Sequence, residues 1–218
     1  MERKIKGYIF DLDGTLIDSL DAWVNIGKRY LKGKYIEADD ALDNIMKNMS
    51  FKEGATYIKE TYHLSDSVED ILQGLYLLVE KRYENDVQLY DGVQEFLEKC
   101  HQKGYTMCVL TASSSRLAKK ALERLGVIKY FDYIYSCQTI GYTKRQPEVY
   151  LEVIKRMKLK PNQCVVVEDA LYAIQIASSI QLQVKAIQNQ ENQKDWKTIC
   201  QLTKYAYISF RDMEESFH

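Results

Sequence analysis

The sequence lacks an excess of charge of one sign, a paired-cysteine motif and a long apolar run. Its 30 basic and 31 acidic residues leave a formal net charge of -1, which argues against a general binder of nucleic acids or of membrane surfaces. Its five cysteines are an odd number and none belongs to a C-x-x-C pair. This usage fits a reducing compartment better than a disulfide framework or a structural zinc site.

No segment approaches the roughly 18 consecutive apolar residues that a membrane span requires. The first 14 residues carry charge but lack the apolar centre of a signal peptide. We therefore expect a cytoplasmic protein that does not enter a membrane. Hydrophobic residues make up 46% of the 218 residues, which is enough for one large domain, or one domain with an insertion, and excludes a disordered chain.

Short apolar runs separated by helix-length segments recur along most of the chain. Such alternation predicts an α/β fold, here a Rossmann-like three-layer sandwich with a mostly parallel sheet. Leu117, Ala121 and Leu122 lie at helical spacing in one of the connecting segments, and Gly126 supplies its C-terminal stop. The predicted strands are Ile5–Phe10, Thr106–Leu110, Tyr133–Tyr135, Cys164–Val167, Leu182–Ile187 and Tyr205–Phe210.

Residues 16–89 depart from this alternation. They contain several amphipathic stretches and no convincing strand, which indicates a small helical domain inserted after the first strand. The predicted α/β core is therefore discontinuous and consists of residues 1–15 and 90–218. Near the C-terminus, the polar run Gln188–Lys194 is interpreted as a solvated turn before the last helices.

The segment with the most chemical information begins at the end of the first predicted strand. Asp11 and Asp13 are two residues apart, so in an extended chain their side chains project to the same face. Two carboxylates at the end of a buried strand are costly unless a cation or a shared proton compensates them. Gly14 permits a sharp turn directly after the pair.

Three further segments place polar groups after predicted strands. Thr111 can donate a hydrogen bond from its side chain, and the N–H groups after it, beginning with Ala112, can hold an anion at a helix start. Lys144 lies shortly before a proline that opens a helix. Glu168 and Asp169 end an apolar strand, an expensive arrangement without a metal. In open α/β sheets ligands bind at the carboxyl ends of the strands, where we expect these groups to meet.

The four segments, in this order and at these separations, resemble the four motifs of the haloacid dehalogenase superfamily. The helical insertion resembles the cap domain of the subfamily that includes β-phosphoglucomutase, phosphoglycolate phosphatase and phosphonoacetaldehyde hydrolase. The resemblance implies a Mg²⁺-dependent phosphatase that acts on a small phosphorylated metabolite. It also implies a covalent aspartyl-phosphate intermediate.

The resemblance assigns a role to each residue of the motifs. Asp11 is expected to be the nucleophile, and Asp13 the acid that protonates the leaving oxygen and then the base that activates water. Electrostatic stabilisation of the transferred phosphoryl group is expected from Thr111, Lys144 and the N–H of Ala112. Glu168 has two alternative roles, as a direct or water-mediated metal ligand or as the residue that orients Lys144. The expected Mg²⁺ ligands are the side chain of Asp11, the backbone carbonyl of Asp13, Asp169 and Glu168.

Two positions depart from the family pattern. The third motif commonly reads Lys-Pro-x-Pro, whereas this chain has Arg145 after Lys144, so the loop is expected to be less rigid. A glycine is usual four positions after the aspartate of the fourth motif, and this chain has Ala173. The dehalogenase branch itself is disfavoured, because its first motif lacks the aspartate that Asp13 supplies. Activity is still expected, since every charged catalytic group is present.

The segment 45–52 occupies the place of the substrate-specificity loop of the cap. The mutases of the subfamily have a pattern similar to Lys-Gly-x-Ser-Arg there, but this chain has Asn48 at the glycine position and Phe51 at the arginine position. Lys52 does not replace a fixed guanidinium, so we rank hydrolysis above mutase chemistry. Alternatively, Met49 and Phe51 belong to the core of the cap.

Phosphonate cleavage would need a desolvated cap lysine, for which the candidates are Lys28, Lys32, Lys47 and Lys52.

The leading prediction is thus a phosphatase. Its alternatives are a β-phosphoglucomutase-type isomerase and, ranked below it, a non-catalytic binding or regulatory protein on the same scaffold. The expected partner is a small phosphorylated metabolite, with no nucleic acid and no membrane. The expected oligomeric state is a monomer or a weak dimer.

Overall fold

The computed structural model describes residues 4–46 and 49–215 and divides into two compact units. One unit consists of residues 1–18 and 88–218, and the other of Ser19–Val87. The two connecting segments are hydrogen-bonded to each other inside the first unit, because the N–H of Asp18 donates to the carbonyl of Gln88 at 2.9 Å. Ile17 also bridges to Leu89. These contacts explain why the helical unit is slightly shorter than the predicted range 16–89.

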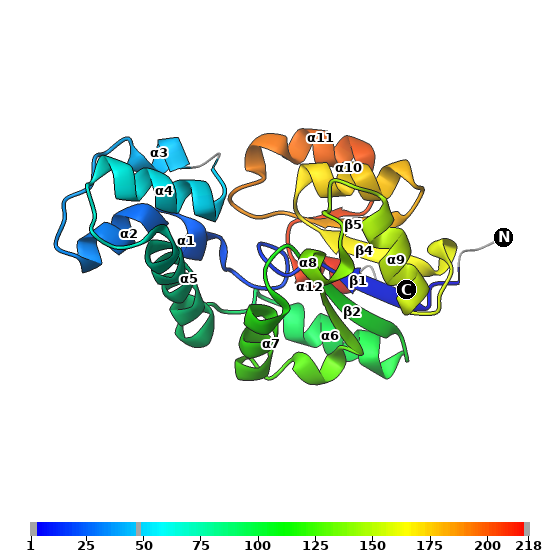
Figure 1. The fold of residues 1–218 in the computed structure, drawn as a ribbon. Helices are drawn as coiled ribbons and strands as arrows, with labels where there is room; N and C mark the ends of the chain where they lie inside the picture. Colours follow the sequence, from blue (N-terminus) through cyan, green and yellow to red (C-terminus); the bar gives the residue numbers. More distant parts are fainter. Residues whose placement is uncertain (1–3, 47–48, 216–218) are drawn as a thin grey trace. The chain divides into compact units, whose positions relative to one another are not determined.

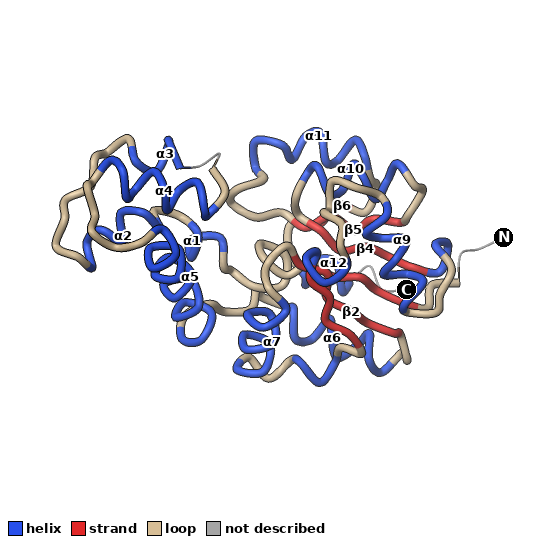
Figure 2. Tube along the Cα trace, in the orientation of Figure 1, coloured by secondary structure: helices blue, strands red, loops and turns tan. Residues whose placement is uncertain are grey.

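The first unit is built on a six-stranded sheet in the order β3-β2-β1-β4-β5-β6 (Figures 1 and 2). Every pairing between neighbouring strands is parallel. The predicted α/β class, with a mostly parallel Rossmann-like sheet, is confirmed. The strands are β1 (Gly7–Phe10), β2 (Thr106–Thr111), β3 (Tyr133–Ser136), β4 (Cys164–Glu168), β5 (Gln183–Ile187) and β6 (Ala206–Tyr207).

Helices cover both faces of this sheet. On one face Ile9 and Val166 pack with Val153 and Ile174 in a buried core built from α8, α9, α10 and α11. On the other face the ring of Phe96 in α6 contacts strand and helix aromatic residues, and α7 lies on the same side (Figure 1). The helices of this unit are α6 (Val93–Gln102), α7 (Ser115–Arg124), α8 (Cys137–Ile140), α9 (Glu148–Arg156), α10 (Leu171–Ser179), α11 (Trp196–Leu202) and α12 (Phe210–Glu215).

The last strand is shorter than the sequence pattern predicts. Only Ala206–Tyr207 forms β6, whereas a strand was expected over Tyr205–Phe210. The physical reason lies at Ser209, whose N–H donates to Asp212 Oδ2 at 3.1 Å while its hydroxyl accepts from the Asp212 N–H at 3.2 Å. This reciprocal cap begins α12 at Phe210 and ends the extended conformation.

The second unit contains only helices among its described residues. Reciprocal caps begin its two longest helices: Ser50 pairs with Glu53, and Ser67 pairs with Asp70. No helix within residues 4–46 or 49–215 combines the length and the apolar character needed to cross a membrane. The helices of this unit are α1 (Leu20–Trp23), α2 (Ile26–Gly33), α3 (Leu42–Met46), α4 (Phe51–Thr61) and α5 (Val68–Asn85).

Candidate active site

The first motif lies at the carboxyl end of β1. The N–H of Asp11 donates to the carbonyl of Val167 in β4 at 2.9 Å, so the chain continues the sheet for one residue beyond the strand. Gly14 then adopts a positive φ of 88°, a conformation that favours glycine, and its N–H donates to the carbonyl of Ile17. This turn leaves Asp11 buried and Asp13 half-buried.

The fourth motif lies beside the first because β4 pairs directly with β1. The sheet order reverses between these two strands, which is the place where open α/β sheets bind ligands. Glu168 and Asp169 are 1% and 7% exposed. One carboxylate oxygen from each of Asp11, Glu168 and Asp169 lies within 4.8 Å of the others. The structure thus brings together three of the predicted acidic residues.

Lys144 is 4% exposed and joins two of these carboxylates. Its Nζ contacts Asp11 Oδ1 and donates to Glu168 Oε2 at 2.8 Å. The other oxygen of Glu168 accepts from the N–H groups of Asp169 and Ala170, both at 3.1 Å. Both oxygens of Glu168 therefore have hydrogen-bond partners, one of them the ammonium of Lys144.

The single positive charge of Lys144 does not balance the three neighbouring carboxyl groups when all of them are ionised. Burial first, and then the neighbouring carboxylate, raises the pKa of Asp11 and of Glu168 to about 7 despite the opposing effect of Lys144. Burial also raises the pKa of Asp169 to about 6, with a further contribution from Asp11. Burial alone disfavours the ammonium of Lys144, but the two facing carboxylates raise its pKa well above the usual value. With all three carboxyl groups ionised, a divalent cation would restore neutrality.

The donor atoms fit such a cation. Asp11 Oδ2 is buried and has no hydrogen-bond partner in the part of the chain that the structure describes. A buried carboxylate oxygen without a partner is costly, and a metal ion would remove that cost. The surrounding set consists of carboxylate oxygens, the ligands that Mg²⁺ prefers. The residues present therefore fit Mg²⁺.

The second motif contacts Asp13 rather than the acidic cluster. Thr111, at the end of β2, donates from its hydroxyl to Asp13 Oδ2 at 3.1 Å. The Ser113 hydroxyl donates to the same oxygen at 2.7 Å, and the Ser113 N–H donates to Thr111 Oγ1 at 2.9 Å. Ala112 lies between them and is exposed. Ser113 was not among the predicted site residues, although it follows the end of β2 by two residues, and Asp13 follows the end of β1 by three.

Two asparagines at the same edge of the sheet were also missed. Asn189 and Asn192 are 8% and 5% exposed and both hydrogen-bond to Asp169. The interpretation of Gln188–Lys194 as a solvated turn is wrong for these two residues. A signal was available, because a polar residue soon after Ile187, the end of β5, lies at the same edge as the acidic residues.

The family of haloacid dehalogenase-like hydrolases matches residues 8–187. The chain belongs to this family. It is 26% identical over 175 residues to the phosphorylated carbohydrates phosphatase of Thermotoga maritima, covering 80% of this chain and 81% of the relative. It is 27% identical over 179 residues to the β-phosphoglucomutase of Bacillus subtilis, covering 76% of each.

A solved structure agrees in fold. The HAD-hydrolase YfnB of Bacillus subtilis, in a crystal structure bound to magnesium, superposes with a TM-score of 0.75 at 15% identity and covers 97% of this chain and 98% of that chain. The predicted resemblance and the predicted enzyme class, a phosphatase of the haloacid dehalogenase-like hydrolases, are confirmed.

This haloacid dehalogenase-like hydrolase has side-chain contacts in the loop where its third motif lacks the first proline. The guanidinium of Arg145 lies 4.3 Å above the ring of Tyr172 in α10. Gln146 Oε1 accepts from the N–H of Thr143 at 2.9 Å and from its hydroxyl at 3.2 Å. These contacts hold the segment around Lys144 although the first proline of the motif is absent.

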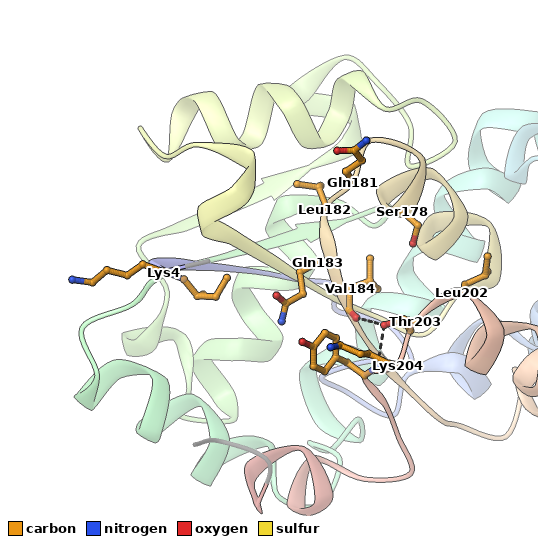
Figure 3. Close-up of a pocket in the computed structure, with 11 residues that line it drawn as sticks. Lys4, Ser178, Gln181, Leu182, Gln183, Val184, Leu202, Thr203 and Lys204 are labelled. Atoms are coloured by element: carbon orange, nitrogen blue, oxygen red, sulfur yellow. Dashed lines mark hydrogen bonds between the residues drawn. The ribbon is translucent and has the colours of Figure 1, made fainter. Parts of the chain in front are cut away.

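A wide cavity of the hydrolase lies at the other end of the sheet. It has a volume of about 1180 Å³ and lies near the amino ends of β1 and β5, where Lys4, Gln183 and Thr203 line it (Figure 3). Its lining contains two lysines but no carboxylate, histidine or cysteine. The cavity therefore lacks the groups that phosphoryl transfer requires.

Proposed function

We propose that this protein is a Mg²⁺-dependent phosphatase that hydrolyses a small phosphorylated carbohydrate through an aspartyl-phosphate on Asp11. The observation that carries the proposal is the buried Asp11, which has one oxygen against Lys144 and the other without a partner in the described residues. Relatives that act on phosphorylated carbohydrates support the substrate class. A cytoplasmic location and a monomeric or weakly dimeric state remain predictions.

The metal would be held by the side chains of Asp11 and Asp169 and by the backbone carbonyl of Asp13, with Glu168 beside them. When bound, it would supply positive charge against the buried carboxylates and the phosphoryl oxygens. Lys144 and the N–H of Ala112 would hold the phosphoryl oxygens and stabilise the charge that develops on them. Thr111 would join them when its hydroxyl turns from Asp13 Oδ2 to a phosphoryl oxygen.

The proposed chemistry needs two carboxyl groups in different protonation states. A carboxylate oxygen of Asp11 attacks phosphorus, an O–P bond forms, and the ester P–O bond breaks as Asp13 donates its proton to the leaving oxygen. Asp13, now a carboxylate, removes a proton from water as the water oxygen attacks phosphorus. The bond to Asp11 then breaks and inorganic phosphate leaves, so the net reaction is ester plus water to alcohol plus phosphate.

The hydroxyl contacts of Asp13 suit this exchange. Thr111 and Ser113 both donate to Asp13 Oδ2, so two hydroxyl groups hold this carboxyl group in place. The two aspartates also have different surroundings, since Asp11 contacts Lys144 whereas Asp13 is held by neutral hydroxyls. Different surroundings are what separate acid and nucleophile roles in a carboxyl pair.

We also propose that the helical unit Ser19–Val87 acts as the cap that selects the substrate. Phe51 lies in a ring cluster, with centroids 5.6 Å from Trp23 and 4.9 Å from Tyr76. Phe51 thus packs against other rings of this unit while remaining half-buried. Lys47 and Asn48 lie outside the described residues.

The test is phosphate release by the purified protein across a panel of sugar phosphates, nucleotides and glycolate phosphate. We expect turnover with Mg²⁺, none with EDTA, and a loss of about 10⁴-fold or more in kcat for Asp11→Asn. Asp91→Asn is the matched control, because Asp91 is an exposed carboxylate of the same unit and pairs with Arg211. Absence of phosphate release from the whole panel, or an active Asp11→Asn protein, would contradict the proposal.

The named mutase relative supports a second candidate function. A β-phosphoglucomutase-type isomerase would convert β-glucose 1-phosphate to glucose 6-phosphate with little phosphate release, which a coupled dehydrogenase assay detects. A non-catalytic role would require that wild-type and Asp11→Asn proteins behave identically in the cell.

A further inference from the structure

The segment between β5 and α11 carries two buried amides at the candidate active site. Asn189 and Asn192 follow Ile187, the last residue of β5, by two and five positions. Their exposed neighbours Gln190 and Glu191 have the solvent access that a polar surface turn predicts. A buried amide needs hydrogen-bond partners for both its NH₂ group and its oxygen. The partners of Asn189 and Asn192 therefore show which groups they hold in place.

Asn189 bonds the side chain of Asp169. Its Nδ2 donates to Asp169 Oδ2 at 2.6 Å and to the carbonyl of Gly14 at 2.9 Å. Its Oδ1 accepts from the N–H groups of Glu191 and Asn192, both at 3.0 Å. These partners fix the orientation of the amide, because a flipped group would face its oxygen towards a carboxylate and a carbonyl.

Asn192 hydrogen-bonds to the main chain. Its Nδ2 donates to the carbonyls of Asp169 and Ile187, both at 2.9 Å, and its Oδ1 accepts from the N–H of Asn189 at 3.0 Å. Asn192 therefore closes the loop and holds the backbone of Asp169, whereas Asn189 holds the carboxylate.

The second oxygen of Asp169 has its own donor. The Thr15 hydroxyl donates to Asp169 Oδ1 at 3.0 Å. Each carboxylate oxygen thus receives one hydrogen bond and keeps a further lone pair for another partner. The carboxylate cannot rotate without losing one of the two bonds.

We propose that Asn189 is a positioning residue that fixes the Asp169 carboxylate for a divalent cation and ties it to the turn of the first motif through the Gly14 carbonyl. This inference rests on the proposed Mg²⁺ site. Partners of metal ligands orient those ligands before the ion binds, and their loss typically weakens metal affinity about 10–100-fold. Asn189 orients Asp169 in this way, although the loop in which it lies belongs to none of the four motifs.

The experiment measures metal binding without substrate. Mn²⁺ alone is titrated into the full-length wild-type, Asn189→Ser, Asn192→Ser and Gln190→Ser proteins and followed by electron paramagnetic resonance. Serine at position 189 retains an acceptor for the local turn but cannot reach Asp169. We expect Asn189→Ser to raise the Kd for Mn²⁺ about 10–100-fold, Asn192→Ser to raise it less, and Gln190→Ser to leave it unchanged.

The same four proteins are assayed against Mg²⁺ concentration. We expect Asn189→Ser to raise the Mg²⁺ concentration at half-maximal activity and to recover kcat to within several-fold of wild type at saturating Mg²⁺. Wild-type affinity in Asn189→Ser overturns the inference, and so does an equal loss in Asn192→Ser, which would assign the effect to the loop. A wild-type protein that binds no Mn²⁺ would instead refute the proposed metal site.

A second measurement covers the case in which Asn189→Ser does not fold. The side-chain amide resonances of the wild-type protein are followed by nuclear magnetic resonance during titration with Mg²⁺. We expect the Asn189 amide to shift more than that of Asn192, because only Asn189 touches a carboxylate oxygen of Asp169. An Asn189 amide that does not shift while the metal binds overturns the inference.

Discussion

The carboxyl end and the amino end of one sheet have opposite chemical character. At the carboxyl end, Asp11, Lys144 and Glu168 are all less than a tenth exposed, and Lys144 contacts both carboxylates. At the amino end, a cavity of about 1180 Å³ is lined by neutral and basic side chains without a carboxylate. The cavity at the amino end thus has no group suited to phosphoryl transfer, whereas the carboxyl end carries a cluster of buried charges.

The difference between the two ends of the sheet separates what stability requires of the sequence from what a functional site requires. Grouped buried carboxylates oppose folding, because each must leave water and repels the others. A sequence selected for stability alone would avoid them, and local conflicts of this kind are expected at functional sites. The buried charges, rather than the size of a hollow, mark the site.

We expect the largest difference between the two ends of the sheet when a lysine is replaced by methionine at each end and kcat/KM is measured. Lys144→Met should lower kcat/KM by about 10³-fold, since it removes the cation that faces Asp11 and the proposed phosphoryl site. Lys204→Met, in the cavity lining at the amino end, should leave kcat/KM within about twofold. Phosphate release at saturating Mg²⁺ measures both. Equal losses in the two variants would remove the distinction between the ends.

A buried lysine in β5, outside the candidate active site, tests what a buried charge costs in stability. Lys185 in β5 is 6% exposed and lies over the rings of Phe96 and Tyr207, and burial lowers its pKa to about 8. The unfolded chain therefore binds more protons above pH 8, and this lysine makes stability rise with pH from about 8 to 10.5.

We expect Lys185→Met to be more stable than wild type at pH 7 by on the order of 1–3 kcal/mol. The difference should shrink as the pH rises to 10, because the wild-type lysine then loses its charge. Urea unfolding at a series of pH values measures it. A stability difference that does not change with pH would show that the charge of Lys185 has no such cost.

Magnesium should change the pH dependence of stability at the carboxyl end. In EDTA, the raised pKa values of Asp11, Glu168 and Asp169 make the folded protein bind protons that the unfolded chain releases. The stability they contribute is full below about pH 4 and is lost as the pH rises through about 6 to 7. We therefore expect the Tm in EDTA to fall between pH 5 and pH 8.

Mg²⁺ should reverse this fall because it binds the ionised carboxylates. At about 100 times its Kd it would add roughly 2.7 kcal/mol, and we expect a larger rise in Tm at pH 8 than at pH 5. Thermal unfolding by circular dichroism gives the result. Asp169→Asn should flatten the slope in EDTA, whereas a rise in Tm of the same size at both pH values would argue against a site made of these carboxylates.

The smallest expected effect lies at the amino end. Gln183 begins β5 and lines the cavity while being half-buried. Gln183→Ala should change kcat/KM less than twofold and the free energy of unfolding by about 0.5 kcal/mol or less, as is usual away from packed or charged features. A large loss of activity in this variant would give the cavity a role that its lining chemistry does not predict.

The sequence was sufficient to predict that three acidic residues lie together at one edge of the sheet. Asp11, Glu168 and Asp169 follow apolar runs, and the carboxyl ends of parallel strands meet at one edge, so the placement follows from the pattern. Asn189 and Asn192 also soon follow a strand, β5, so the sequence could have placed them at this edge. Their contacts with Asp169 were not predictable, because their segment has the composition of a surface turn and these contacts depend on the three-dimensional path of the loop.

The same limit explains two other differences. The hydroxyl of Ser113 reaches Asp13 because the chain turns between β2 and α7, which the order of residues does not specify. The early end of β6 depends on the reciprocal cap at Ser209 and Asp212, which competes with strand formation. In both cases short polar side chains decide the local path.

The bond between the Asp18 N–H and the Gln88 carbonyl has a consequence for protein engineering. The two points where the chain departs from and re-enters the α/β unit are spatial neighbours, so this unit is interrupted along the sequence but not in space. Excising Ser19–Val87 and joining the ends with a short glycine-containing turn should leave the sheet foldable. A foreign domain could be inserted at the same junction. Such chimeras would replace the helical unit and retain the α/β unit.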